Sequence, residues 1–488
     1  MERELLVGEG LQASDGATRA AQGSTDSRAP ARIQTAPGRR EMNVAVLKTK
    51  AEQALTEAFA GAKAELPGAS EVRKVRADAI GRFGALGLPH RRIEAWKYTD
   101  LRNAMKEALP PGARKVPRIT VADVTAALGP LAGIDAQRIV FVDGWYAPDA
   151  SALVADGKVT AASLAEILTE DKYAAGLLRL DGRDDDAVLA LNTAYASDGA
   201  VVDIAGGAKL DKPLLLVFVR AGVEPQFVAA RNVVRIGDGA EATIIEAFVT
   251  LPGAAKEFQL NAATKIVVGN GAVVSHVKCT LESGGGTHLA NWLIDLGGDA
   301  DYRGFHFTTG TALARNQIGV TFKAPGGKLD LSGAFLARGG EHIDTTLVVD
   351  HAVPGCTSRE LFKGVLDGHA RGVFQGKVIV RPDAQKTDGK QMAQVLMLSP
   401  DTEFDSKPEL EIYADDVVCG HGSTSADIDE DLLFYCQSRG IPEGQARALL
   451  IESFIGEALE KVEREDLREA LVALARSWLD RTTPAKGM

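Results

Sequence analysis

Ile266-Val-Val-Gly-Asn-Gly271 is a short β-branched run that ends directly in a tight turn, and this pattern recurs throughout the middle of the chain. A brief apolar run bounded by Gly, Asp, Asn or Pro indicates a β-strand and the turn that follows it. Seven such runs occupy residues 234–236, 266–268, 293–296, 320–322, 347–349, 378–380 and 410–412. From about Gly199 onward the sequence therefore predicts many short strands joined by turns.

The spacing of these runs decides between β architectures. Their last residues lie 26 to 32 positions apart, and a repeat of about 30 residues with two or three strands is typical of a solenoid. Each coil of a solenoid buries its apolar face only by stacking on its neighbours. No helix-like segment separates the runs, which excludes a doubly wound α/β sheet. A β-solenoid is the favoured fold, and a sandwich of two stacked sheets is the structural alternative.

Helical patterns flank the β region on both sides. Apolar residues recur every three to four positions over residues 44–83, and shorter helical stretches are expected near 163–168 and 174–180. After the solenoid, Asp429 is expected to cap one helix and Pro442 to open a second. We therefore divide the chain into a disordered extension 1–41, a mixed helical domain 42–198, a β-helix core 199–427 and a helical domain 428–488.

The second C-terminal helix carries a broad apolar stripe that includes Leu450, Phe454 and Ile455. A stripe of this kind either caps the open end of the solenoid or docks a partner protein.

The composition narrows the classes of function. Hydrophobic residues make up 45% of the 488 residues, charged residues make up 25%, and the formal net charge is −11. An acidic chain is a poor partner for nucleic acid, and no run of 18 apolar residues predicts a membrane span. The four cysteines, from Cys279 to Cys436, include no C-x-x-C pair, so a reduced, cytoplasmic setting is expected.

Familiar catalytic motifs are missing from the sequence. It has no G-x-x-x-x-G-K-[ST] phosphate loop, no G-x-S-x-G elbow and no H-E-x-x-H. Any nucleotide hydrolysis is therefore expected in another subunit. Most histidines and cysteines are expected to make local hydrogen bonds or to pack in the core.

Cys419-Gly420-His421 differs in kind from the other cysteines and histidines. A thiolate and an imidazole two residues apart on an extended segment face the same side, and both suit iron, copper or zinc. Two ligands cannot complete a metal site, so the others must come from elsewhere in the chain or from another chain. On spacing alone, a structural role is the more frequent outcome.

Residues 372–388, 407–424 and 433–441, together with Glu94-Ala-Trp-Lys-Tyr-Thr99 and Ala190-Leu-Asn-Thr-Ala194, resemble segments of the SufB/SufD family of iron–sulfur cluster assembly proteins. Gly422 stands where SufB-like chains tend to carry a glutamate. Cys356 lies in a context unlike that of the additional cysteine in those chains. The resemblance is therefore to the SufD type.

The resemblance implies a right-handed parallel β-helix core with helical domains at both ends, in a non-catalytic scaffold subunit of the SUF system. It implies pairing through the last turns with a SufB-like subunit or with a second copy of the chain. It also implies docking of a SufC-like ABC-type ATPase on the C-terminal helices, where Leu450, Phe454 and Ile455 lie. A flavin on the complex is left open.

The resemblance also assigns roles to the Cys-x-His pair. His421 matches a histidine thought to supply an iron ligand at the interface between subunits, where an iron–sulfur cluster is held transiently. Cys419 matches the neighbouring cysteine, whose role is less defined.

Two other functions stay open on the sequence. The chain could be a purely structural partner that contributes no ligand, in which case Cys419 and His421 would be dispensable and the stripe at Leu450 would not. A carbohydrate-acting β-helix enzyme would need paired carboxylates on one face and usually a secretion signal, which the sequence does not predict.

Overall fold

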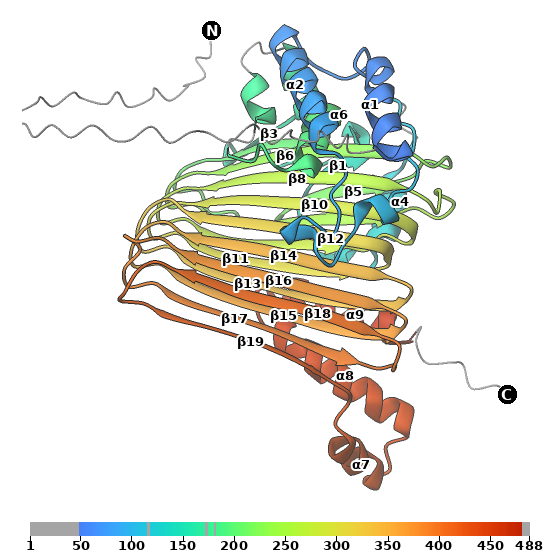
Figure 1. Cartoon of the computed structure of the whole chain (residues 1–488), viewed down its shortest axis with the longest axis vertical. Helices are drawn as coiled ribbons and strands as arrows, with labels where there is room; N and C mark the ends of the chain where they lie inside the picture. The colour runs from blue at the N-terminus through green and yellow to red at the C-terminus, as the bar shows by residue number, and fades with distance from the viewer. Residues whose placement is uncertain (1–47, 115–117, 171–173, 180–181, 481–488) are drawn as a thin grey trace, which may run out of the picture. The chain divides into compact units, whose positions relative to one another are not determined.

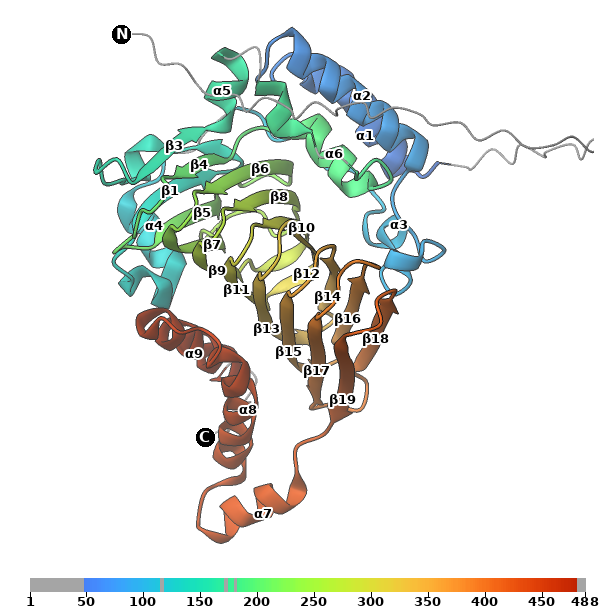
Figure 2. The same ribbon diagram turned by 90° about the vertical axis from the view of Figure 1, so that its left-hand side faces the viewer.

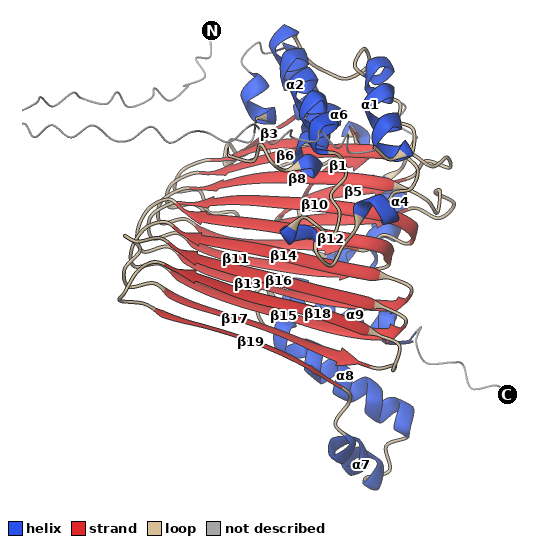
Figure 3. Ribbon diagram, viewed as in Figure 1, coloured by secondary structure: helices blue, strands red, loops and turns tan. Residues whose placement is uncertain are grey.

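Two β-sheets dominate the computed structural model, which describes residues 48–114, 118–170, 174–179 and 182–480. The predicted disordered extension of residues 1–41 lies outside the described residues. From β4 onward, successive strands alternate between sheet A and sheet B, and each pairs in parallel with the strand two positions away (Figures 1 and 3). This is a parallel β-helix with two strands per coil, so the predicted β-solenoid is confirmed.

Sheet A contains the even-numbered strands from β4 onward and the antiparallel strand β3 at its N-terminal end. In sheet order they are β3 (Val159–Ser163), β4 (Ala200–Ile204), β6 (Phe227–Ile236), β8 (Gln259–Val268), β10 (Gly284–Leu296), β12 (Thr311–Phe322), β14 (His342–His351), β16 (Arg371–Val380) and β18 (Glu403–Ile412).

Sheet B contains the odd-numbered strands from β5 onward and the antiparallel hairpin of β1 and β2. In sheet order they are β2 (Trp145–Tyr146), β1 (Gln137–Val142), β5 (Leu214–Arg220), β7 (Glu241–Thr250), β9 (Val273–Thr280), β11 (Asp301–Thr309), β13 (Lys328–Gly339), β15 (Thr357–Gly368), β17 (Asp388–Met397) and β19 (Val418–Ala426). Because β1 pairs in parallel with β5, sheet B extends into the chain before residue 199, where the predicted solenoid domain begins.

The Gly269-Asn-Gly271 turn, which follows the run Ile266–Val268, shows how the coils stack. Gly271 has φ 63°, in the left-handed region that glycine adopts without strain. Its neighbour Asn270 lies between two other coils: its backbone N–H donates to Asp238 Oδ1 at 2.7 Å, and its Oδ1 accepts from the N–H of Gly298 at 2.8 Å. The Gly-Asn-Gly turn is therefore both a corner of one coil and a link to the coils on either side.

The space between the sheets is the main core. Its apolar side chains come from alternate positions of both sheets, as the period of two requires. Phe218 stacks on Phe141 with ring centroids 5.3 Å apart and on Phe248 at 4.6 Å, so aromatic rings continue from coil to coil.

Helices flank both sheets. They are α1 (Lys50–Ala62), α2 (Ser70–Leu86), α3 (Leu101–Ala104), α4 (Val121–Leu128), α5 (Leu164–Glu170), α6 (Ala187–Tyr195), α7 (Glu430–Ser438), α8 (Glu443–Leu459) and α9 (Glu465–Asp480), with 3₁₀ turns η1 (Glu94–Trp96), η2 (Gly129–Gly133), η3 (Pro148–Ala150) and η4 (Ala174–Leu178). Helix α6 contacts sheet A, and α8 contacts sheet B (Figure 2).

The helical pattern predicted over residues 44–83 is confirmed from residue 50 onward, and residues 44–47 lie outside the described residues. It forms two helices, α1 and α2, and the segment between them contains Pro67 and Gly68, which has φ 140°. The C-terminal prediction is confirmed at its start, since the Asp429 side chain accepts a hydrogen bond from the N–H of Leu432. None of the helices in the described part of the chain is long and apolar enough to cross a membrane.

Candidate functional site at the open end of the solenoid

The two sheets end in β18 and β19 (Figure 1). Among the residues that the structure describes, no strand pairs with the outer edge of either one. A free edge presents unpaired backbone N–H and C=O groups and is a template for a strand of another chain. Strand β19 carries Cys419, Gly420 and His421, so this open end is the candidate site.

Both candidate ligands belong to inward rows of the solenoid. The register pairs Cys419 with Gly389 and His421 with Gln391, and Gln391 with Glu360 one coil earlier. Cys419 is half-buried and packs against the core between the sheets, whereas His421 is exposed because no coil follows it. The prediction that the two side chains share one face is confirmed by this register.

Burial weakens Cys419 as a nucleophile. Desolvation of the half-buried side chain raises the pKa of its thiol above the ordinary value. Since the thiolate is the form that binds metal, Cys419 needs a positive partner before it can act as a ligand. This agrees with the sequence argument, which ranked it below His421.

Glu360 is a site residue that the sequence argument missed. Its side chain is 2% exposed, and its carboxyl faces the hydroxyl of Ser358, two residues earlier on the same strand. Burial raises the pKa of Glu360 to about 8. The sequence could have indicated it, because Glu360 lies two residues before Phe362 on the same strand. Side chains two residues apart in a strand face the same side, and Phe362 belongs to the core.

We expect Glu360 to make the stability of the metal-free protein depend on pH. Its pKa rises from 4.5 to about 8 on folding, so the folded state keeps a proton that the unfolded state loses. The contribution is fully present below pH 4.5 and is lost as the pH rises through 8. Relative to Glu360→Gln, which does not titrate, the wild type should lose up to about 5 kcal/mol of unfolding free energy over this range. Urea unfolding in the presence of a chelator measures the difference, and parallel pH profiles for both proteins would contradict it.

The three stripe residues of α8 differ in exposure. Ile455 is 2% exposed and belongs to the core between α8 and sheet B, while Leu450 and Phe454 are partly buried against that core. The ammonium of Lys363 in β15 lies 4.2 Å from the Phe454 ring centroid and pairs with Glu457. The stripe therefore attaches α8 to the solenoid.

The exposed apolar side chains of α7 and α8 lie on surfaces of these helices that sheet B does not cover. Four large ones are more than half exposed: Leu432 at 51%, Phe434 at 71%, Tyr435 at 53% and Leu449 at 51%. Three of them are on α7, which projects past β19 (Figure 2). The sequence does not reveal their exposure, because the periodicity of a short helix does not show which face is covered.

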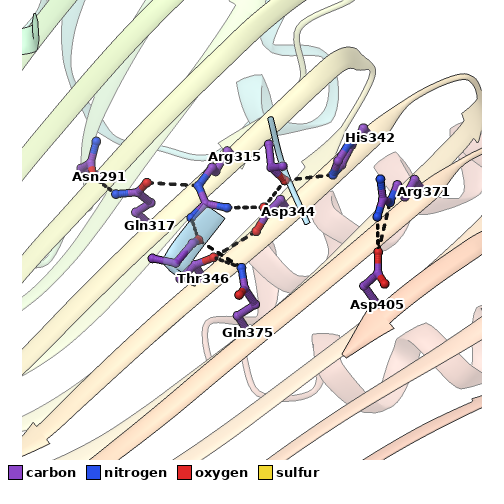
Figure 4. Close-up of polar contacts among 11 residues, drawn as sticks. Asn291, Arg315, Gln317, His342, Asp344, Thr346, Arg371, Gln375 and Asp405 are labelled. Carbon is purple, nitrogen blue, oxygen red and sulfur yellow. Dashed lines mark hydrogen bonds and ion pairs between the residues drawn. The ribbon is translucent and has the colours of Figure 1, made fainter. Parts of the chain in front are cut away.

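The segment Glu94–Thr99, one of the motifs singled out in the sequence, lies across the outer face of sheet A. The guanidinium of Arg315 in β12 is 3.7 Å from the Trp96 ring centroid and pairs with Asp344 in β14 (Figure 4). Asp344 also accepts a hydrogen bond from Thr99, and Lys407 in β18 pairs with Glu94. The segment thus links the N-terminal helices to the last strand of sheet A.

A second set of buried polar groups lies between the sheets in the middle coils. Lys278 donates hydrogen bonds to Thr280 at 2.7 Å and Asn316 at 3.0 Å, and burial lowers its pKa to about 8. His288 Nδ1 lies 2.6 Å from Glu282 Oε2. His288 therefore makes the local hydrogen bond that was expected of histidines within strands.

Two family models match consecutive parts of the chain. The model described as "SufBD protein N-terminal region" matches residues 49–216, and "SUF system FeS cluster assembly, SufBD core domain" matches residues 218–454. The chain belongs to the SufBD family. The core match contains both Cys419 and His421 and ends within α8, so the candidate site lies in the part that defines the family.

Curated proteins whose names include SufBD or SufD align with this chain over most of its length. A SufBD family protein of Synechocystis is 31% identical over 409 residues, which are 81% of this chain and 88% of the relative. The iron-sulfur cluster assembly protein SufD of Escherichia coli is 32% identical over 390 residues, 79% of this chain and 88% of the relative. The SufD of Bacillus subtilis is 24% identical over 306 residues, 60% of this SufBD chain and 66% of the relative. The SufD-type resemblance noted in the sequence agrees with these names.

Proposed function

We propose that this chain is the SufD-type scaffold subunit of a SUF complex and that an iron–sulfur cluster is assembled at its open solenoid end. The observation that carries the proposal is the position of His421: an exposed imidazole on the free edge strand, beside the inward Cys419. Imidazole and thiolate both bind iron. Among the described residues no three His, Cys, Asp or Glu side chains converge as a metal site, so a partner supplies the other ligands.

A SufB-like subunit is the proposed partner at this end, with a second copy of the chain as the alternative. Four large apolar side chains near the two free edges are exposed: Met392 at 36%, Ile412 at 42%, Tyr413 at 60% and Val418 at 61%. Apolar side chains gathered beside unpaired strand edges favour a protein interface. Pairing there would cover them and bring the partner's ligands beside His421.

A SufC-like ATPase is proposed to dock on α7 and the adjacent surface of α8. Helix α8 is attached to β15 through Phe454, Lys363 and Glu457, so a displacement of α7 and α8 is transmitted to the last coils. Closure of the ATPase on ATP would then shift the open end and expose the ligands for iron and sulfur. The chain itself acts as a scaffold, and the ATPase activity belongs to the partner.

We expect Phe434→Ala to impair docking of the ATPase while leaving the fold intact. Phe434 is 71% exposed, so its removal costs no core packing. Co-purification with a tagged SufC-like partner should fall by about tenfold or more, as expected for an aromatic anchor at an interface. The measurement is the ratio of the two chains recovered from co-expressing cells.

Ile455→Ala is the matched control. Ile455 is 2% exposed beneath α8, so this variant should lose about 2–5 kcal/mol of unfolding free energy. Undiminished recovery of the ATPase with Phe434→Ala would show that α7 is not the docking surface.

The test of the whole proposal is co-expression of the chain with SufB-like and SufC-like partners, followed by anaerobic cluster reconstitution. A purified complex that holds a cluster supports the scaffold role. A complex that assembles clusters equally well without this chain would refute it. All four cysteines are free, which supports a reducing, cytoplasmic setting. Membership of a cluster-assembly family removes the support for a carbohydrate-acting enzyme.

A further inference from the structure

The outer face of sheet B carries a basic hollow at the open end. Strands β13, β15, β17 and β19 are the last four of this sheet (Figure 2). Their register sets one outward row, made of Asp330 in β13, Arg359 in β15, Lys390 in β17 and Gly420 in β19. The row and Lys461, which lies between α8 and α9, line a hollow of about 400 Å³, and Cys419 and His421 belong to the same lining. Three cations therefore adjoin the candidate site in a chain whose formal net charge is −11.

Two of these three cations already have an acid of their own. Arg359 donates to Asp388 Oδ2 at 2.6 Å and is the main cause of the lowered pKa of that carboxyl. Lys461 Nζ lies 2.9 Å from Asp330 Oδ2. Lys390 is exposed, acts on Asp388 only from a distance, and forms no ion pair among the described residues. It also lies directly opposite Arg359, and like charges in that position are unfavourable. Lys390 is therefore the cation that lacks a carboxylate.

Gly420 leaves the next position of the row open. A Cβ added there would have no atom within 4 Å. Because β19 is a free edge, a strand that pairs with it would continue the row, and its residue opposite Gly420 would lie about 10 Å from Lys390, two strand spacings away. A lysine and a carboxylate side chain can meet over a glycine at that separation. Val418, 61% exposed beside Gly420, offers an apolar contact to the same strand.

We propose that the strand which pairs with β19 in the assembled complex carries an Asp or Glu opposite Gly420, and that this carboxylate enters the hollow and pairs with Lys390. The occupant is the edge strand of the SufB-like subunit, and this identity rests on the proposed function. Complementary charges at an interface fix the register of two partners and exclude wrong partners. Lys390 then selects the partner strand and sets its register beside His421.

A second copy of the chain does not offer such a carboxylate. The outward positions of β19 include no acid and are Val418, Gly420, Gly422, Thr424 and Ala426. The four acids of β18 all pair with cations of their own chain, Glu403 and Asp405 with Arg371, and Glu409 and Glu411 with Lys377. A second copy would have to break one of these pairs to reach Lys390. The charges at the open end therefore favour a different chain.

The test is the affinity of the full-length chain for the purified SufB-like subunit, measured by titration. Lys390→Glu should bind about tenfold more weakly than the wild type or worse, because it brings two like charges together across the interface. It also places an acid opposite Arg359, so the fold should be retained. Lys328→Glu is the matched control: Lys328 is an exposed lysine of the same face in β13, three strands from the free edge, and this variant should bind as the wild type does.

A charge exchange identifies the partner residue. One Asp→Lys or Glu→Lys variant in the edge strand of the SufB-like subunit should restore the binding of Lys390→Glu. Equal affinities of the wild type and Lys390→Glu would overturn the pairing, and so would the failure of every such exchange. A dimer of the isolated chain that Lys390→Glu dissociates, seen by sedimentation, would make a second copy the occupant instead. No binding of the wild type to the SufB-like subunit would refute the partner in the proposed function, and with it the occupant named here.

Discussion

His421→Ala is expected to abolish cluster assembly by the complex of this chain with its SufB-like and SufC-like partners. The side chain is exposed on β19, so its removal should change the unfolding free energy by no more than about 0.5 kcal/mol. Loss of an outer-sphere partner of a metal already costs about 10–100-fold in activity, and loss of a ligand should cost at least that. Anaerobic reconstitution, followed by absorbance of the bound cluster, measures the yield.

His369→Ala is the matched control for that experiment. His369 lies in the turn between β15 and β16, its side chain is 76% exposed, and it is not on a free edge strand. Both variants should co-purify with their partners, and only His421→Ala should lose the cluster. If the yield of His421→Ala equals that of His369→Ala, the chain is a purely structural partner and contributes no ligand through this histidine.

The solenoid was predictable because its coils repeat. A run such as Ile266-Val-Val268 followed by Gly269-Asn-Gly271 carries both the strand and the corner, and the recurrence of that unit implies stacking. The number of strands per coil was harder to predict, since a spacing of about 30 residues accommodates two long strands or three short ones. Pro67 and Gly68 indicate the break between α1 and α2, but the apolar periodicity continues on both sides of it and makes the break hard to recognise.

The candidate site was only partly predictable, because position across the sheet depends on register. The spacing of Cys419 and His421 implied a shared face, but it could not say that the face is inward. Glu360 belongs to the same row through pairing between strands that lie about 30 residues apart in sequence. The exposure of Phe434 and the burial of Ile455 depend on tertiary contacts, since α8 packs on β13 and β15 while α7 packs on α8, and no local pattern encodes these contacts.

Asp344→Ala is expected to be among the most destabilising single substitutions in the chain. Asp344 is fully buried and pairs with Arg315, whose side chain is 1% exposed, and it accepts hydrogen bonds from Thr99 and Thr346 (Figure 4). Removing the carboxylate leaves the Arg315 guanidinium buried without its counter-charge, which typically costs about 3–5 kcal/mol. Urea unfolding measures the loss, and limited proteolysis within Glu94–Thr99 should accelerate, because that segment loses its attachment to β14.

Asp350→Ala on the same strand removes an aspartate from an exposed ion pair, and it therefore tests whether burial of the pair determines the cost of removing its carboxylate. Asp350 makes two 3.0 Å contacts with Arg381, whose side chain is 52% exposed, so this pair resembles the first in chemistry but not in environment. Water replaces the lost partner of an exposed arginine, and the expected cost is about 0–1 kcal/mol. Equal losses from the two variants would show that Arg315 finds another partner in the variant. A large loss of unfolding free energy from Asp344→Ala alone would support the buried ion pair as the attachment of the segment Glu94–Thr99 to sheet A. The same segment reaches the strand at the open end, where Glu94 pairs with Lys407.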